Sequence, residues 1–446
     1  MSLGRLFDIS ARTLSTYQRA IEVTSNNISN AGNAEYSRQK VNIGSDISLN
    51  GIGIGVKISD IQRVRDEMVD AQIRKYQSAL SSADKKSEML GRIETILSEP
   101  SEMGLSNYLT QFFNSWQELT VNPTSIQARS NILQKAKRLA ERYNEIKIGI
   151  EDVQSQIIND ARIKVSQLNT HVVELRSLNQ KIFDTESRGV NAGELKDQRD
   201  ALIEKVAKLA NVSVSPTEQG AVTVNVGGLL AADQVYNNKF VLEVTEGELK
   251  IGIENDKSSK AVINSGEIGA LLELHSKNIG DYKNKFNNLI TTLTERVNNY
   301  HQQGFALDGS LGTKFFEISS DGKLLLNVTD PGKLAAADVT GNSGNAKIAN
   351  QIYRIAEDEK VFNGSLIMDE YTNILNSLGT ERISNDDRAD SNELIVQQLQ
   401  NQRASVSGVS LDEEMTNVLK YQRSYDAAAR LVKVADDMLQ TILNMV

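Results

Sequence analysis

Each end of this chain carries a narrow apolar stripe on a long predicted helix, and this pairing limits the fold more than any other feature. The first helix is predicted from Leu3 to Ile28 and the last from Leu411 onward, because apolar side chains recur there at every third or fourth position. The two stripes, called the terminal seams below, contain Leu3, Phe7, Leu14, Tyr17, Ile21 and Ile28 at one end and Val418, Tyr421, Tyr425, Leu431, Ala435, Met438 and Ile442 at the other. A single stripe would usually pack on the protein's own core. Two narrow stripes favour packing of the end helices on each other, with the remaining surface open to neighbouring copies.

Polar residues mark the inner boundaries of both terminal helices. Asparagine, serine and glycine dominate residues 25–33, and asparagine and glycine tolerate the left-handed backbone that often follows a helix. Before the last helix, Ser410 and Glu413 have the spacing of a capping box, in which both side chains satisfy free backbone donors. The first helix is therefore expected to end near Asn30 and the last to begin at Ser410.

The middle of the chain is mainly helical, with short strand-forming segments. Alternating apolar residues on either side of Asn50-Gly51 predict a β-hairpin over 41–58. A period of three to four residues continues from 61 to 210, and two glycines near residue 190 favour a break there. Alternation returns over 211–261, and helices are expected again after 266, after 346 and after 390.

The fold class predicted from these patterns is mainly α with small β insertions (α+β), divided among three domains. Paired terminal helices over 1–33 and 410–446 form an inner coiled-coil domain. A bundle of long helices, with the hairpin at 41–58, takes 34–210, 262–304 and 346–409. A small antiparallel β-rich outer domain takes 211–261 and 305–345.

Composition excludes several classes of function. There is no cysteine, so disulfides, thiolate metal sites and cysteine nucleophiles are ruled out. The net charge of −9 lacks the basic patch that nucleic-acid binding requires. No apolar run reaches the roughly 20 residues that span a bilayer, and no cleavable signal peptide is expected.

Catalytic chemistry is not expected either. The three histidines, His171, His275 and His301, all lie in helical stretches, and no nucleophile, phosphate-loop or zinc motif is present. Acidic clusters at 357–359 and 386–387 are better explained as solvated faces than as cation sites. We predict a non-enzymatic structural protein without cofactor or metal.

Both ends of the chain resemble a known family. The run from Ala20 to Gln39 resembles the N-terminal signature of bacterial flagellar rod, hook and hook-associated proteins, although residues 32–35 depart from the usual turn. The run from 407 to 430 resembles the same axial proteins, and the segments 195–202, 266–272 and 304–309 resemble landmarks of hook-associated members. The signature residues are Asn26, Asn27, Ile28, Asn30, Tyr36 and Ser37.

The resemblance implies a structural role between the flagellar hook and filament. It implies a ring-forming homo-oligomer whose terminal helices form an inner tube. It also implies export through the flagellar type III channel and an extracellular location. The expected partners are other copies, the hook protein, a second hook–filament junction protein and an export chaperone at the C-terminal helix. Alternatives are a hook, rod or filament subunit, or an intracellular coiled-coil scaffold.

Overall fold

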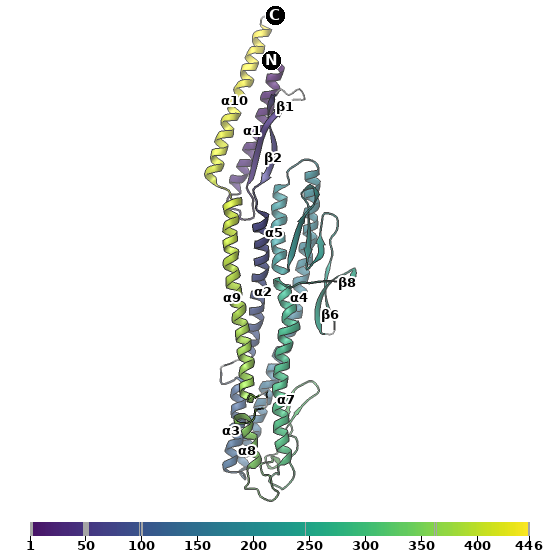
Figure 1. Ribbon diagram of the computed structural model, residues 1–446, viewed down its shortest axis with the longest axis vertical. Coiled ribbons are helices and arrows are strands. Elements are labelled where there is room, and N and C mark those ends of the chain that lie inside the picture. The colour runs from purple at the N-terminus through teal and green to yellow at the C-terminus, as the bar shows by residue number, and fades with distance from the viewer. Residues whose placement is uncertain are drawn as a thin grey trace.

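Two unusually long helices set the length of the molecule. The computed structural model describes residues 3–47, 53–97, 99, 101–245, 247–360, 362 and 364–444. Helix α4 (Ile126–Ser187) has 62 residues, about 93 Å at the usual rise, and α9 (Ile367–Ser407) has 41. Helix α2 (Glu67–Leu97) runs beside α9, and the whole chain forms a rod with both termini at one end (Figure 1). This architecture confirms the predicted fold class.

The end of the rod that holds both termini is built from two helices and a hairpin, called the terminal unit below. Helix α1 (Leu3–Ser29) and α10 (Leu411–Leu443) pack side by side in opposite directions, as expected (Figure 1). Strands β1 (Gln39–Ile47) and β2 (Gly53–Arg63) pair antiparallel and cover a second side of α1. The predicted hairpin is therefore present, while its Asn50-Gly51 turn lies outside the described residues.

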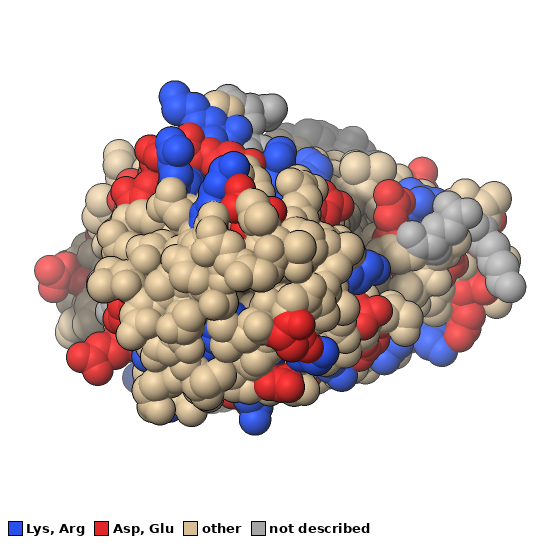
Figure 2. Space-filling model, turned by 90° about the horizontal axis from the view of Figure 1, so that it is seen from below, with Lys and Arg blue, Asp and Glu red and all other residues tan. Residues whose placement is uncertain are grey.

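The end of the rod farthest from the termini contains an aromatic core. Helices α3 (Leu105–Val121), α7 (Gly280–Gln303) and α8 (Lys347–Glu357) surround it, together with the start of α4. Its buried rings include Phe112, Phe113, Trp116, Phe315 and Phe316, which meet at centroid distances of 4.8–6.3 Å. Seen from below, the tip of this end is mainly uncharged, and charged residues lie around its edge (Figure 2).

The segment 305–345 packs against this aromatic core. Its short strands β9 (Phe316–Ile318) and β10 (Leu324–Leu326) contact α7 and α4, and a 3-10 turn (Pro331–Lys333) follows them. The expected grouping of 305–345 with 211–261 differs from this arrangement. The reason is that Phe315 and Leu324 are buried between the helices at the tip of the rod.

A second core lies nearer the terminal unit. The C-terminal half of α4 and α5 (Gly193–Leu209) pack against two three-stranded sheets. The chain breaks between α4 and α5, as predicted, with Gly189 at a φ of +73°. The sheets are β3 (Val212–Pro216), β4 (Val222–Val226) and β5 (Leu229–Ala232), then β6 (Phe240–Thr245), β7 (Glu248–Ile253) and β8 (Asp256–Ala261), with a 3-10 turn at Glu218–Gly220. Helix α6 (Gly266–Glu273) continues through a π-helical turn (Leu274–Ile279) into α7.

His301 lies in the last turn of α7 as a neutral side chain in the aromatic core. Its Nδ1 donates to the Thr313 carbonyl at 2.6 Å, and its Nε2 accepts from the Ala335 amide at 2.9 Å. A second ring proton would meet the Ala335 N–H. Burial, the largest cause, and the nearby Arg129 charge together lower the pKa of His301 to about 4, against the hydrogen bond to the Thr313 carbonyl, which raises it.

Stability is therefore expected to fall as the pH drops from 7 to 5. In the unfolded chain the histidine binds a proton below about pH 6.5, whereas in the folded protein it does so only below about pH 4. Proton binding therefore favours the unfolded state by about 2 kcal/mol at pH 5. Urea titrations followed by Trp116 fluorescence would measure this change in stability, because the Trp116 ring lies 6.5 Å from the His301 ring. In His301→Gln this part of the pH dependence should disappear. An unchanged slope in the variant would contradict the assignment.

Candidate functional site

The terminal seams only partly meet each other. The rings of Tyr17 and Tyr421 pack at a tilt with centroids 6.2 Å apart, and the small side chains of Ala428 and Ala435 on α10 are buried. The seam residues Phe7, Leu14, Ile21, Ile28, Val418 and Tyr425 are half-buried, and the side chain of Leu3 lies outside the described set. The remaining three are exposed: Leu431 by 47%, Met438 by 50% and Ile442 by 53%. Together with Val434 they form a continuous apolar stripe on α10, called the α10 stripe below.

A second face of α1 is buried although its side chains are small or polar. The Thr16 hydroxyl donates to the Val56 carbonyl of the hairpin at 3.0 Å, and Arg12 pairs with Asp46 at 3.0 Å. Sequence analysis missed this face, because threonine and alanine at helical spacing give little apolar signal. The signal that could have revealed this face is the spacing of Thr16, Ala20 and Asn27, which lie four and seven residues apart and therefore on one side of the helix.

The signature residue Asn27 lies at the centre of a buried polar group, called the Glu414 cluster below. Its Nδ2 donates to the Gln39 carbonyl at 2.8 Å and to Glu414 Oε2 at 2.9 Å. Its Oδ1 accepts from the Tyr36 hydroxyl at 2.7 Å and from the Gln39 amide at 3.0 Å. All four hydrogen-bonding positions of the amide are used, so asparagine is required by the geometry of this site.

The Glu414 carboxylate is the anion of this cluster, and only 2% of the residue is exposed. Arg38 reaches its Oε1 through Nε at 2.9 Å and Nη2 at 2.8 Å, and also pairs with Glu413 at 2.7 Å. Burial and the carboxylates of Asp197, Glu194 and Glu414 raise the pKa of Tyr36, so its hydroxyl stays a donor. The cluster joins the end of α1 and the start of β1 to the first turn of α10.

The predicted capping box is not formed. Ser410 is the N-cap residue of α10, but its hydroxyl makes no capping hydrogen bond. Glu413 is paired with Arg38, as described above, so that carboxylate serves tertiary structure instead of the helix end.

The other signature residues link α1 to α5. The Asn26 Nδ2 donates to Glu194 at 2.9 Å, and Asn30 Nδ2 donates back to the Asn26 carbonyl at 3.0 Å. The Ser37 amide donates to Asp197 Oδ2 at 3.2 Å. Ile28 is half-buried. The signature therefore contacts both the last helix and the body of the rod.

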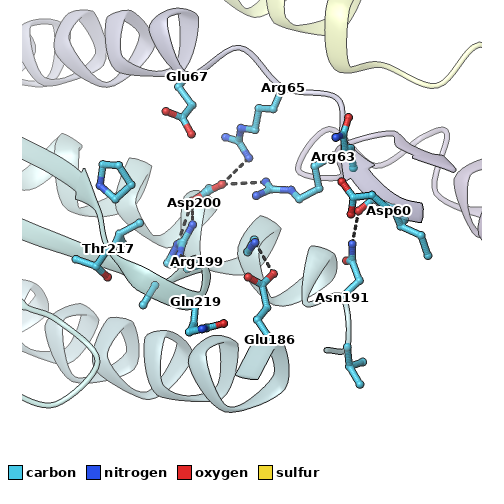
Figure 3. Close-up of a pocket in the computed structure, with 18 of the residues that line it drawn as sticks. Asp60, Arg63, Arg65, Glu67, Glu186, Asn191, Arg199, Asp200, Thr217 and Gln219 are labelled. Atoms are coloured by element: carbon cyan, nitrogen blue, oxygen red, sulfur yellow. Dashed lines mark hydrogen bonds and ion pairs between the residues drawn. The ribbon is translucent and has the colours of Figure 1, made fainter. Parts of the chain in front are cut away.

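Beside it lies a cluster of alternating charges, called the Asp200 cluster below. It consists of Arg63, Arg65, Asp70, Asp197, Arg199 and Asp200. Figure 3 shows the three arginines around Asp200. Asp200 accepts from Arg63 at 2.9 Å, Arg65 at 2.9 Å and Arg199 at 3.2 Å. Arg65 also pairs with Asp70, and Arg63 with Asp197 at 2.6 Å. Segment 195–202, singled out as a sequence landmark, thus supplies the carboxylates that hold β2 and the start of α2.

Electrostatics favour the charged form of Asp200. Burial alone would raise its pKa, but the guanidinium groups of Arg199, Arg65 and Arg63 lower the pKa below the ordinary aspartate value. The two clusters together connect the terminal unit to the rod.

In the described ranges, no group of three or more histidine, aspartate or glutamate side chains could hold a metal ion. No helix described there is both long and apolar enough to span a bilayer.

Comparisons with known proteins fit this arrangement. A family model for the flagellar hook-associated protein FlgK helical domain matches residues 90–316, and one for the flagellar basal body rod FlgEFG protein C-terminal region matches 397–445. Flagellar hook-associated protein 1 of Bacillus subtilis is 28% identical over 97% of this chain and 96% of its own length. The Salmonella typhimurium protein of the same name is 24% identical over 97% and 98%. The solved structure of the flagellar hook junction protein FlgK from Burkholderia pseudomallei aligns with a TM-score of 0.68 at 12% identity, over 76% of this chain and all of that one.

Proposed function

Because the chain belongs to the FlgK family of flagellar hook-associated proteins, structural subunits of the bacterial flagellar axis, we propose that it forms the junction between hook and filament. The observation that carries the proposal is the correspondence over 97% of this chain with proteins named flagellar hook-associated protein 1. The antiparallel pair of α1 and α10 adds physical support, since it gathers both termini into one narrow unit at the end of the rod.

The hydrophobic cores of the rod indicate which segments belong to each proposed domain. We propose that 1–33 and 410–446 form the inner domain and that 211–261 forms the exposed outer domain. The helical bundle between them takes the remaining segments, and 305–345 joins it because its apolar side chains enter the aromatic core. Torque between hook and filament would then pass through the Glu414 and Asp200 clusters, which lie where the inner domain meets the bundle.

Assembly is proposed to use the α10 stripe. The four residues Leu431, Val434, Met438 and Ile442 are each about half exposed after α1 and α10 have paired. Monomeric proteins rarely leave a continuous apolar stripe in water unless a partner covers it. We infer that neighbouring copies cover it in a ring, which closes the inner tube.

Charge on the α10 stripe is therefore expected to block assembly without unfolding the monomer. Each of these side chains contributes about 1.5–3 kcal/mol when it is fully buried. The double variant Met438→Glu with Ile442→Glu should lose that contribution at every contact, while its melting temperature as a monomer stays unchanged. Filament counts in a complemented deletion strain and circular dichroism of the free protein would measure both effects. Lys433→Glu on the polar side of α10 is the matched control and should assemble normally.

The remaining partners follow from the same role. We propose that the hook protein contacts one side of the ring and a second junction protein the other. We further propose that the protein leaves the cell through the flagellar type III channel. An export chaperone that covers the α10 stripe would keep copies from associating before secretion.

Deletion of the gene from a motile host tests the junction role. Electron microscopy should then show hooks without filaments, with filament protein shed into the medium. Cells that also lack hooks would point to a rod or hook subunit instead. Intact filaments and normal swimming would overturn the flagellar junction role and favour an intracellular scaffold.

A further inference from the structure

Helix α10 has a second exposed apolar stripe, separate from the α10 stripe. Leu411, Met415 and Leu419 follow one another at intervals of four residues in the first half of the helix, and they are exposed by 50%, 59% and 56%. A spacing of four residues places them on one side of the helix. This set is called the Met415 stripe below. It lies just after the end of α9, where the chain enters the terminal unit (Figure 1).

The two stripes lie on opposite flanks of α10. Because an α-helix turns by about 100° per residue, the mean directions of the two stripes differ by about 150° around the helix axis. Tyr421, whose ring packs on Tyr17 of α1, lies between the stripes on one side of the helix. The exposed charged residues Arg423, Arg430 and Asp437 lie between them on the other side. A helix in a wall of parallel helices has this pattern, because it needs an apolar surface toward each of its two neighbours.

The two stripes also lie at different heights along α10. The middle of the Met415 stripe comes about 21 residues before the middle of the α10 stripe, a distance of about 32 Å at the usual helical rise. If parallel copies stood at one height, the Met415 stripe would meet the exposed Lys420 of its neighbour, and the α10 stripe would meet the exposed Lys433. A shift of about 32 Å between neighbours instead brings one apolar stripe against the other.

Charged side chains beside the stripes also match in the shifted arrangement. Asp412 is exposed beside the Met415 stripe and Arg430 beside the α10 stripe, both on the side of α10 that faces away from Tyr421. Among the described residues, neither side chain has an ion-pair partner. Residue 430 comes 18 positions after residue 412, so the shift brings Asp412 of one copy within about one helical turn of Arg430 of the next. Apolar surface and charge are therefore complementary in the same arrangement.

We propose that the Met415 stripe of one copy packs against the α10 stripe of the next, with neighbours shifted by about 32 Å along the helix axis. The two surfaces are different parts of one chain, so the contact is heterologous, and each copy offers one surface to each of two neighbours. Because the contact includes a shift as well as a rotation, it gives the ring of copies a helical step. This inference rests on the proposed assembly through the α10 stripe, and it names the surface that covers that stripe.

Charge on the Met415 stripe tests whether this surface is needed for assembly. Met415→Glu should leave the melting temperature of the free protein unchanged, because the side chain is exposed there. The variant should still reach the medium, but in the complemented deletion strain the fraction of cells with filaments should fall at least about tenfold, since the contact would bury an unpaired carboxylate. Lys433→Glu is again the matched control and should assemble normally. Normal filaments in Met415→Glu would overturn the proposal.

Paired cysteines test the shift between neighbours, because the chain has no cysteine of its own. In the double variant Met415→Cys with Met438→Cys, the two thiols of one copy are about 35 Å apart on the same helix, so a disulfide can form only between copies. Mild oxidation of assembled flagella should give a ladder of covalent multimers, whereas oxidation of the free monomer should not. Met415→Cys with Lys420→Cys, the pair that neighbours at one height would bring together, should give no ladder.

The two cysteine pairs separate the possible failures. A ladder from the second pair, with or without one from the first, would mean that neighbours stand at one height, and it would overturn the shift. Filaments that give no ladder from either pair would overturn the contact itself. If deletion of the gene left filaments intact, the proposed function would fail instead, so its failure is distinguishable from that of the shifted contact.

Discussion

Replacing Asp200 with alanine is expected to lower the free energy of unfolding by about 3–5 kcal/mol. The carboxylate accepts from Arg63, Arg65 and Arg199, and these guanidinium groups are themselves largely buried. The change removes the carboxylate paired with Arg199 and one of the carboxylates paired with each of Arg63 and Arg65, so the cluster keeps an excess positive charge in a region from which water is mostly excluded. That cost exceeds the value of any single pair. Urea unfolding followed by circular dichroism would measure the loss.

The pH dependence of the same variant gives an independent readout. The folded pKa of Asp200 is lowered below its ordinary value, so its carboxylate contributes stability above about pH 4, and this contribution is lost as the pH falls through the folded pKa. Asp200→Ala should lack this part of the acid transition. Asp184→Ala, which removes an exposed aspartate of α4, is the control and should remain within about 0.5 kcal/mol of the wild type. If both variants lost equal stability, the Asp200 cluster would not hold the joint.

Sequence patterns predicted the helices better than the contacts between them. Both terminal helices, the hairpin strands and the break near Gly189 were visible because each depends on local periodicity or on glycine and asparagine at a turn. The position of 305–345 was not visible. Its few apolar residues, such as Phe315 and Leu324, are spaced without a clear period, and their burial depends on helices far away in sequence.

The terminal seams show how far an apolar stripe can be interpreted. A period of three or four residues indicates which side of a helix avoids water, but it does not say which partner covers each residue. Ala428 and Ala435 are the buried apolar residues of α10, yet alanine gives a weak signal, whereas the prominent Met438 and Ile442 are about half exposed in the single chain. The contact of Asn27 with Glu414 spans 387 residues of sequence and leaves no local trace. Only the resemblance to axial proteins drew attention to Asn27.

Asn27→Asp is expected to destabilise the terminal unit by about 3 kcal/mol, the cost of leaving a buried charge without its partner. The donor that lies 2.9 Å from Glu414 Oε2 becomes a carboxylate oxygen, and the hydrogen bond to the Gln39 carbonyl is lost as well. Hydrogen exchange of α1 and α10 amides would detect the loosened pairing, and thermal melting would measure its size. Filament formation should fail in the same variant, since the terminal unit is the proposed assembly element.

A falling pH should rescue this variant. Two adjacent buried carboxylates raise the pKa of one of them above its value in the unfolded chain, so the folded variant takes up a proton more readily than the unfolded one. Its deficit relative to the wild type should therefore shrink as the pH drops from 7 toward 5. Asn33→Asp is the matched control: its Oδ1 accepts from the Glu35 amide at 3.0 Å, a bond that aspartate can keep, so no change is expected. A deficit that stayed constant with pH would mean that Asn27 acts through packing alone and that the Glu414 cluster is not an electrostatic joint.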